Sequence, residues 1–282
     1  MDCPPPLPPL ALDLLRRARR RFTPCGDGQL VWHLWGEGRP LLLLHGGSGS
    51  WLHWIHNIDA LTSLGRSVLV PDLPGFGDSA LPPGGEDADA VIEPVRAGWC
   101  ALQIEFGWQE PLELAGFSFG GIVAGFWIER YPHDLRRVVI TGSPGFGFSQ
   151  VQRTALRGWR HLSDPAQRMA AHRHNLQALM LHDARAIDAQ ALAIQAINTP
   201  RDRLPRRRLA ATAVLRPIFE RSPVPVRFAY GAEDALYASG YEPFRQWTAR
   251  LPQSEGLHLI AGAGHWAPYE RPQAWLQAAL PC

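Results

Sequence analysis

A serine flanked by glycines is the feature of the sequence that most directly predicts chemistry. Ser118 lies in the segment Gly116-Phe-Ser-Phe-Gly120, between an apolar run and a helical pattern. In a strand–turn–helix setting, this G-x-S-x-G spacing is typical of a nucleophilic serine on a sharp turn. Such a turn strains the backbone at the serine and leaves no room for bulk two residues before or after it. Ser118 is therefore the candidate nucleophile, and the N–H of Phe119 is a candidate donor to an oxyanion formed beside it.

An acid and a histidine follow Ser118, each at the end of a later apolar segment. A hydroxyl attacks well only when a neighbouring imidazole takes its proton, and His265 is the candidate base. Asp234 would hold that imidazole in the required tautomer and stabilise its cation. Glu233 directly precedes Asp234 and is the competing acid. The order Ser, Asp, His along the chain is one of the known orders for such a constellation.

A glycine-rich turn is a candidate source of a second oxyanion donor. A buried apolar run ends in the segment His45-Gly-Gly-Ser-Gly-Ser50, whose backbone could direct the N–H of Gly47, or alternatively that of Ser48, at a carbonyl oxygen. A phosphate-binding loop is excluded, because no Gly-Lys-Ser/Thr follows and the sequence contains no lysine. We expect His45 to form hydrogen bonds within this turn, and we expect the loop from Asp72 to Ser79 to be structural.

The composition is that of a globular protein with one large domain. The chain has 282 residues, of which 46% are apolar, and a formal net charge of +2. Its basic residues are all arginine and form no extended cluster, so we expect no nucleic-acid partner. No apolar run could span a membrane and the N-terminus resembles no secretory signal, so we expect a cytoplasmic protein without a membrane partner. We expect neither a metal nor a cofactor, and free thiols at Cys3, Cys25, Cys100 and Cys282.

Short apolar segments alternate with helical patterns along most of the chain. We predict strands at Gln29–Trp35, Pro40–Leu44, Ser67–Val70, Pro111–Ala115, Arg137–Thr141, Pro225–Tyr230 and Gly256–Ile260. We predict helices near Asn57–Leu64, Val91–Phe106, Gly121–Tyr131, Tyr241–Leu251 and Gln273–Leu280. This alternation predicts an α/β fold with a mostly parallel, doubly wound sheet covered on both faces. Functional residues of such sheets gather beyond the carboxyl ends of the strands.

Two segments interrupt this alternation. Residues 1–25 are rich in proline and arginine and predict an N-terminal lead with a short amphipathic helix. Residues 146–222 have a helical pattern throughout and separate two strands that should be neighbours in the sheet. An insertion of that size at the carboxyl edge predicts a helical cap over the nucleophile. The core would then consist of residues 26–145 and 223–282.

The motifs together resemble those of α/β-hydrolase-fold enzymes with a helical cap, over residues 26–282. They are His45-Gly-Gly-Ser-Gly-Ser, Asp72-Leu-Pro-Gly-Phe-Gly-Asp-Ser, Gly116-Phe-Ser-Phe-Gly-Gly, Gly231-Ala-Glu-Asp and Gly264-His-Trp-Ala-Pro-Tyr-Glu. Within that fold, His56-Asn-Ile-Asp59 and Gly264-His-Trp266 are similar to segments of the carbon–carbon bond hydrolases of aromatic meta-cleavage pathways. Those enzymes usually carry Asn before the nucleophile, where this chain has Phe117. The resemblance implies a capped serine hydrolase.

Aromatic residues beside the predicted catalytic loops favour a small-molecule substrate with an apolar or aromatic portion. The expected contacts are Trp51, Phe117, Phe146 and Trp266. Candidate partners for a substrate carboxylate in the predicted cap are Arg153, Arg157, Arg160, Arg201 and Arg203. The leading prediction is hydrolysis of a carboxylic ester through an acyl-enzyme on Ser118, without a cofactor. A carbon–carbon bond hydrolase acting on a diketo acid and a ligand receptor with negligible turnover are the alternatives. The oligomeric state, monomer or homodimer, is left open.

Overall fold

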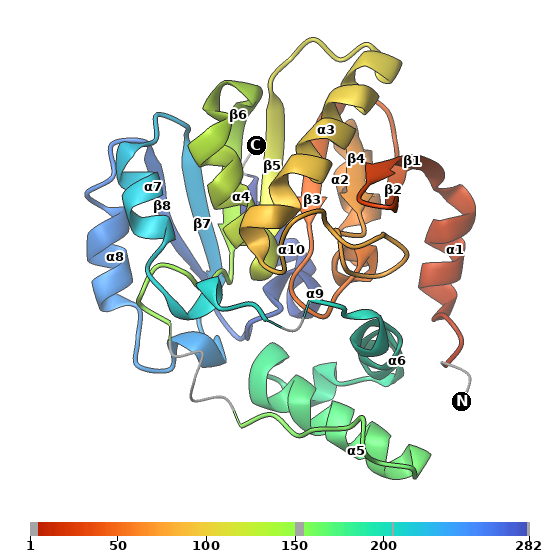
Figure 1. Ribbon diagram of the computed structural model, residues 1–282. Helices are drawn as coiled ribbons and strands as arrows, with labels where there is room; N and C mark the ends of the chain where they lie inside the picture. The colour runs from red at the N-terminus through yellow and green to blue at the C-terminus, as the bar shows by residue number, and fades with distance from the viewer. Residues whose placement is uncertain (1–4, 150–154, 205, 281–282) are drawn as a thin grey trace.

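The computed structural model describes residues 5–149, 155–204 and 206–280. Cys3, Arg153 and Cys282, considered above, lie outside the described residues. The described residues form one eight-stranded sheet with helices on both faces, in the strand order β1-β2-β4-β3-β5-β6-β7-β8 (Figure 1). This architecture confirms the predicted α/β fold with a mostly parallel, doubly wound sheet.

The strands confirm all seven predicted segments and add one more at the N-terminal edge. They are β1 (Arg19–Cys25), β2 (Gly28–Trp35), β3 (Arg39–Leu44), β4 (Arg66–Pro71), β5 (Leu112–Phe117), β6 (Leu135–Thr141), β7 (Val226–Gly231) and β8 (Ser254–Ile260). Neighbouring strands from β4 to β8 are parallel, whereas β2 is antiparallel to both β4 and β1. All six residues of β5 are buried, as expected of a central strand covered on both faces.

The N-terminal segment contains the predicted short helix and, in addition, a strand that was not predicted. Within it, α1 (Pro9–Arg17) is followed by β1, which pairs with β2 along its whole length. A sheet edge tolerates charged side chains on its open side, so the three arginines at 19–21 obscure the strand pattern without preventing the strand. Arg21 forms an ion pair with Glu105, with 2.6 Å between Nε and Oε1, which ties the edge strand to a helix.

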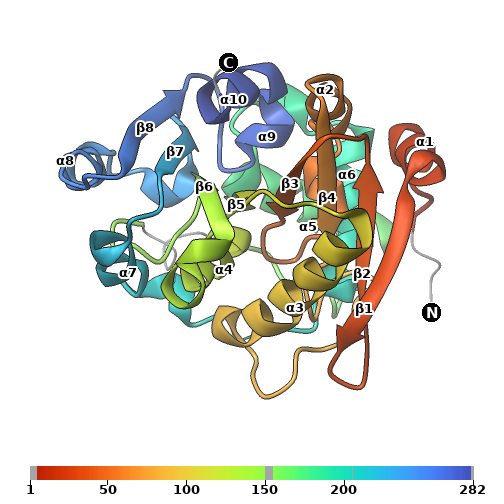
Figure 2. The same cartoon turned by 90° about the horizontal axis from the view of Figure 1, so that it is seen from above.

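Helices cover the two faces of the sheet in two groups (Figure 2). One core lies under α3 (Ala88–Phe106), α4 (Phe119–Arg130), α7 (Leu215–Arg221) and α8 (Glu242–Thr248). The other lies under α1, α2 (Ile58–Ser63), α9 (Ala267–Glu270) and α10 (Pro272–Ala279). α4 is buried and apolar on all sides from Phe119 to Ile128, as expected of a helix packed between the sheet and its neighbours. No helix within the described ranges is both long and apolar enough to cross a membrane.

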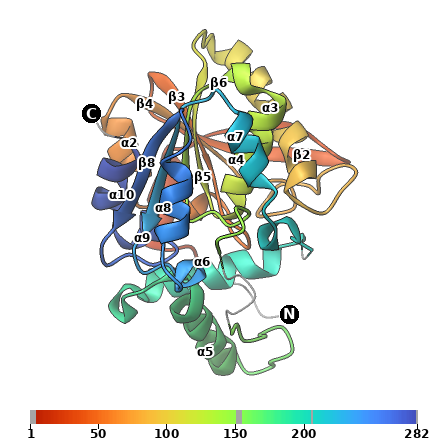
Figure 3. The ribbon, with the colours of Figure 1, turned by 90° about the vertical axis from the view of Figure 1, so that its left-hand side faces the viewer.

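Most of the segment predicted as a cap lies beyond the carboxyl ends of the strands. α5 (Pro165–Asn175), which continues into a π-helical turn at Leu176–Met180, and α6 (Ala189–Asn198) lie there together (Figures 1 and 3). α7 belongs to the same predicted segment but packs on the sheet layer. A Cβ added to Gly125 of α4 would lie 2.4 Å from Leu215 Cδ2, so these two helices are in close contact. The helical pattern alone could not separate α7 from the helices over the site.

Candidate active site

Ser118 occupies the single residue between β5 and α4. Its backbone has φ 50° and ψ −113°, and among the described residues Ser48 is the only other non-glycine residue with a positive φ. This strained conformation turns the chain from strand to helix in one step and lifts the hydroxyl clear of the sheet. The Ser118 N–H donates to the carbonyl of Thr141 at 2.8 Å, which fixes the turn to the neighbouring strand β6.

The glycines around Ser118 are required by close backbone packing. A Cβ on Gly116 would lie 2.5 Å from the carbonyl oxygen of Gly120 and 2.7 Å from Gly121 Cα. A Cβ on Gly120 would lie 2.3 Å from the carbonyl oxygen of Leu44 at the end of β3. The predicted need for small residues on both sides of the nucleophile therefore arises from helix-to-strand contacts that bring α4 against β3 and β5.

We expect Gly120→Ala to destabilise the fold by about 3 kcal/mol or more, because the new methyl group meets a backbone carbonyl that cannot move aside. Gly84→Ala is the control. Gly84, unlike Gly120, has a positive φ, of 76°, but nothing lies within 4 Å of an added Cβ, so only backbone strain of about 1–2 kcal/mol should appear. Urea unfolding followed by tryptophan fluorescence measures both free energies. Equal costs at the two positions would contradict the steric explanation.

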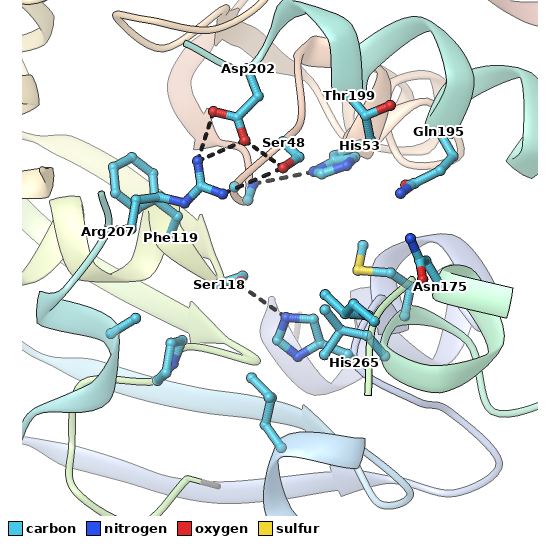
Figure 4. A pocket seen from close by; sticks show the side chains of 18 of the residues that line it. Ser48, His53, Ser118, Phe119, Asn175, Gln195, Thr199, Asp202, Arg207 and His265 are labelled. Atoms are coloured by element: carbon cyan, nitrogen blue, oxygen red, sulfur yellow. Dashed lines mark hydrogen bonds and ion pairs between the residues drawn. The ribbon is translucent and has the colours of Figure 1, made fainter. Parts of the chain in front are cut away.

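The structure brings Ser118, Asp234 and His265 together in one hydrogen-bonded chain. His265 Nε2 lies 2.9 Å from Ser118 Oγ (Figure 4), and His265 Nδ1 lies 2.8 Å from Asp234 Oδ2. The histidine and aspartate side chains are 3% and 0% exposed, whereas Glu233 is exposed. An imidazole that donates through Nδ1 to a buried carboxylate keeps Nε2 free to take the serine proton. The arrangement can therefore activate the Ser118 hydroxyl.

Three tyrosines that the sequence analysis missed surround the aspartate. Asp234 Oδ1 accepts the N–H of Leu236 at 2.9 Å, so both carboxylate oxygens are engaged. Tyr237 donates to the carbonyl of Ser143 at 2.7 Å, and Tyr241 donates to the carbonyl of Gly231 at 2.7 Å. Burial, and after it the charge of Asp234, raise the pKa of both phenols, so they remain donors.

Tyr230, the third of these tyrosines, follows the same pattern at the end of β7. Its phenol donates to the carbonyl of Ser143 at 3.0 Å and accepts the N–H of Ser143 at 3.1 Å. Burial raises its pKa well above the ordinary value. Because the Ser143 hydroxyl donates to the carbonyl of Ser118 at 3.0 Å, Tyr230 supports the nucleophile turn from behind. In the sequence, only the place of Tyr230 near the end of a predicted strand, close to Asp234, could have indicated this role.

Two residues that line the same cavity as Ser118 carry free backbone N–H groups. Those of Gly47 and Phe119 have no hydrogen-bond partner among the described residues, and both residues line the cavity. A Cβ on Gly46 would lie 3.2 Å from Ser118 Cβ, so the glycine-rich turn after β3 lies directly against the nucleophile. Free N–H groups at this position can stabilise negative charge on a carbonyl oxygen.

His45 forms hydrogen bonds within the loops, as expected. Its Nδ1 donates to the carbonyl of Gly46 at 2.8 Å, and its Nε2 accepts the N–H of Leu73 at 2.8 Å. Complete burial lowers the pKa of His45 to about 4, so the ring is neutral near pH 7. His53, which the sequence analysis missed, accepts the Gly46 N–H through Nδ1 at 3.2 Å, and burial lowers its pKa as well.

The buried His45 predicts a loss of stability in mild acid. Since its folded-state pKa of about 4 lies below the ordinary 6.5, the unfolded chain takes up a proton between these pH values that the folded chain does not. Stability is thus unaffected above pH 6.5 and falls as the pH falls toward 4, by about 3 kcal/mol in all. Urea unfolding at pH 7 and pH 5 should show the decrease. In His45→Gln the decrease should be smaller by about 2 kcal/mol, and an unchanged decrease would contradict the assignment.

Ser118, His265 and the glycine-rich turn line a cavity of about 640 Å³. The cavity lies between the edge of the sheet and the segment that contains α5 and α6. Its apolar wall includes Phe117, Phe119, Ile122, Trp159, Leu179, Met180 and Leu236. Asn175 and Gln195 lie on the side of the cavity away from Arg207 (Figure 4). Of the predicted substrate contacts, only Phe117 is part of this wall.

Trp51, Phe146 and Trp266, which were predicted as substrate contacts, do not line this cavity and pack in the two hydrophobic cores instead. Trp51 packs on Trp35, with 5.5 Å between ring centroids. Phe146 belongs to the aromatic core between the sheet and α8. Trp266 stacks on Tyr269 at 4.1 Å, and its indole N–H donates to the carbonyl of His53. Aromatic rings next to these loops support them from behind.

The arginines of the predicted cap have different roles. Arg157 and Arg160 line the cavity from an exposed segment. Arg201 pairs with Asp78, and Arg203 donates to carbonyls of the loop from Asp72 to Ser79, so these two dock the chain onto that loop. Arg207, which the sequence analysis did not single out, also lines the cavity.

We searched the described part of the chain for residues that could bind a metal ion and for reactive thiols. No group of three or more His, Cys, Asp or Glu residues could hold a metal ion there. Cys25 and Cys100 are free thiols. Burial raises the pKa of Cys25 to about 11, so this thiol is unreactive at neutral pH.

The fold and the geometry at Ser118 define a member of a known family. The family profile described as the alpha/beta hydrolase fold matches residues 39–185, more than half of the chain. The chain therefore belongs to the α/β hydrolase fold family and is an α/β hydrolase, which confirms the resemblance drawn from its motifs.

Among individual relatives, the chain is similar to a 2-hydroxy-6-oxo-6-phenylhexa-2,4-dienoate hydrolase of Burkholderia cepacia, with 24% identity over 87% of each chain. Among solved structures it is similar to the esterase RhEst1 of a Rhodococcus species, with a TM-score of 0.72, 22% identity and coverage of 92% and 96%. The meta-cleavage product hydrolase CumD of Pseudomonas fluorescens has a TM-score of 0.69, with 21% identity and coverage of 87% and 90%. The structural likenesses concern the fold.

Proposed function

We propose that the chain is a serine hydrolase in which Ser118, His265 and Asp234 act as a catalytic triad. The observation that carries this proposal is the continuous hydrogen-bonded chain from Asp234 through His265 to Ser118 at the cavity wall. Ser118 Oγ attacks the carbonyl carbon of the substrate while its proton moves to His265 Nε2. The tetrahedral intermediate then expels the leaving group, which takes that proton, and an acyl-enzyme remains. Water, deprotonated by His265, attacks the acyl-enzyme, releases the acid and restores the serine.

Negative charge on the carbonyl oxygen is stabilised, in this proposal, by the N–H groups of Phe119 and Gly47. Support comes from their lack of other partners and from their place beside Ser118. α5 and α6 act as the cap, because Asn175 and Gln195 from these helices line the cavity opposite the sheet. The cap thereby shields the acyl-enzyme from bulk water and selects the substrate.

The proposed substrate is a carboxylic ester with an apolar or aromatic portion. The cavity wall is mostly apolar around Ser118, where Phe117 and Ile122 lie next to the nucleophile. Such a wall contributes binding energy through burial of apolar surface and leaves the polar groups to position the carbonyl. Phe117 in particular provides no hydrogen bond to a polar group of the substrate.

Carbon–carbon bond hydrolysis of a meta-cleavage-type diketo acid is the second candidate, because relatives of the chain are named for that reaction. Arg157 and Arg160 on the cavity wall could attract the carboxylate of such a substrate. We rank it second because Arg207, which lies against Gly47 of the glycine-rich turn, is already paired with Asp202 at 2.8 Å.

Turnover of two substrate sets discriminates between the candidates. The wild-type protein is compared on aryl esters of graded acyl length and on a dienol meta-cleavage product. We expect higher kcat/KM on esters with short or aromatic acyl groups. Fast decay of the dienol with feeble ester hydrolysis would instead establish the carbon–carbon hydrolase. Binding of both sets without turnover of either would contradict an enzyme of this class.

A further inference from the structure

Ser48, in the glycine-rich turn after β3, is held in an unfavourable backbone conformation. Its φ of 50° is in the left-handed region, which costs a residue with a side chain about 1–2 kcal/mol. Strain of this kind persists only where surrounding contacts enforce it, and it concentrates at functional sites. The other strained serine in the described residues is Ser118, which close packing of glycines holds in place. Ser48 needs a comparable restraint.

That restraint comes from outside the sheet. The Ser48 hydroxyl donates to Asp202 Oδ2 at 2.5 Å, across 154 residues of sequence. Asp202 follows the 3₁₀ turn at Thr199–Arg201, at the end of α6. Its side chain is only 9% exposed, so the hydrogen bond is largely protected from water. A charge-assisted bond of this kind is stronger than one between neutral groups.

Arg207 fixes the carboxylate that holds Ser48. Its Nη1 lies 2.8 Å from each oxygen of Asp202 and 2.7 Å from the carbonyl oxygen of Leu204. The arginine therefore binds two residues of its own segment and holds the Asp202 carboxylate in place. Figure 4 shows Arg207, Asp202 and Ser48 connected by dashed lines, above Ser118 in this view. The guanidinium also lies against the turn, since a Cβ on Gly47 would be 3.1 Å from Arg207 Nε.

The turn is therefore held from two directions. On the core side, the Gly46 N–H donates to His53 Nδ1, and a Cβ on Gly49 would lie 2.3 Å from His53 Cε1. On the cavity side, Asp202 and Arg207 hold Ser48 and cover Gly47. Gly47 lies between these two sets of contacts, with its N–H free.

We propose that Asp202 and Arg207 are positioning residues that hold Ser48 in its left-handed conformation and thereby keep the Gly47 N–H directed at the substrate carbonyl. The inference rests on the proposed function, since it assigns the turn to the oxyanion. Arg207 acts here through Asp202 and the turn, and binding of a substrate carboxylate by its Nη1 would require displacement of Asp202. Positioning of the Gly47 N–H lowers mainly the free energy of the transition state, where negative charge develops on the carbonyl oxygen.

A double-mutant cycle between Ser48→Ala and Asp202→Asn tests the proposal, with an activated aryl acetate as substrate. Each single change should lower kcat roughly tenfold and leave KM within about twofold, because an oxyanion donor is misplaced while binding contacts remain. The double variant should be no slower than the slower of the two single variants, because both changes act on the same hydrogen bond between the Ser48 hydroxyl and Asp202. Alanine removes its donor, and asparagine leaves only a neutral acceptor. Additive effects, or effects confined to KM, would overturn the proposal.

Two further variants separate positioning from general damage. Ser48→Gly adopts a φ of 50° without strain, so it should retain more activity than Ser48→Ala. Arg206→Gln is the matched control, because Arg206 is exposed, pairs with Glu86 at 3.2 Å and should leave kcat unchanged. Activity of Ser48→Gly no higher than that of Ser48→Ala, or loss in Arg206→Gln equal to that in Asp202→Asn, would overturn the proposal.

The rate of labelling by a fluorophosphonate provides a readout that does not depend on the natural substrate. The serine oxygen displaces fluoride from phosphorus, and the resulting phosphonyl ester is tetrahedral, with its polarised phosphoryl oxygen in the oxyanion site. We expect labelling of the Asp202→Asn variant to be roughly tenfold slower than that of wild type. Labelling at equal rates would overturn this inference alone. Absence of labelling at Ser118 in the wild-type protein would overturn the proposed function as well.

Discussion

Replacing Ser118 with alanine should lower kcat by about 10⁴-fold or more on any substrate that the protein turns over, with little change in KM. The hydroxyl is the only atom group removed, and His265 and the free N–H groups of the turn stay in place. The fold should be preserved, because the substitution removes one oxygen and adds no atom to the tight turn. Initial rates with aryl esters measure the effect.

Ser143→Ala is a matched control for that experiment. Ser143 is a buried serine just beyond the carboxyl end of the neighbouring strand β6, and its hydroxyl donates only to the backbone carbonyls of Ser118 and Pro144. We expect its loss to cost stability and at most about tenfold in kcat. Ester turnover that persists in Ser118→Ala would refute the proposed nucleophile.

Replacing Asp234 with asparagine should lower kcat by about 10⁴-fold while the protein remains folded. The asparagine amide can donate a hydrogen bond to His265 Nδ1, which places the imidazole proton on Nε2, where it can no longer accept from Ser118. The hydrogen bond from the Leu236 N–H to the side-chain oxygen is retained in this variant. The pH–rate profile and kcat on the same aryl esters measure the effect.

Glu233→Gln separates the two neighbouring acids. Glu233 is exposed and forms no bond to His265, so its substitution should leave kcat within about twofold of wild type. A large loss of activity in Glu233→Gln, or near-normal activity in Asp234→Asn, would assign the acid differently from the geometry.

The positions of Ser118, Asp234 and His265 could be anticipated because each lies in a short segment at the end of a strand. Parallel strands place their carboxyl ends along one edge, so chain order and strand position together suffice to predict that these residues meet. The same reasoning located the glycine-rich turn. It required no knowledge of side-chain packing, and for that reason it was reliable here.

The cavity wall could not be anticipated in the same way. Whether Trp51 or Phe146 faces a cavity or the core depends on which way one side chain points from its loop, and hydrophobicity is equal in both cases. Asp202 and Arg207 were also missed, because their contacts with Ser48 depend on how a distant segment docks on the turn.

The edge strand β1 was obscured by its arginines, whose charge can be exposed at an edge.

Trapping of the acyl-enzyme tests the central claim most directly. The protein is mixed with an excess of an aryl ester, quenched in acid during turnover, and mapped by peptide mass spectrometry. The proposed mechanism predicts the mass of one acyl group on the peptide containing Ser118, with fragmentation assigning it to that residue. Steady turnover with no acyl group on the protein, or with the acyl group on another residue, would contradict it.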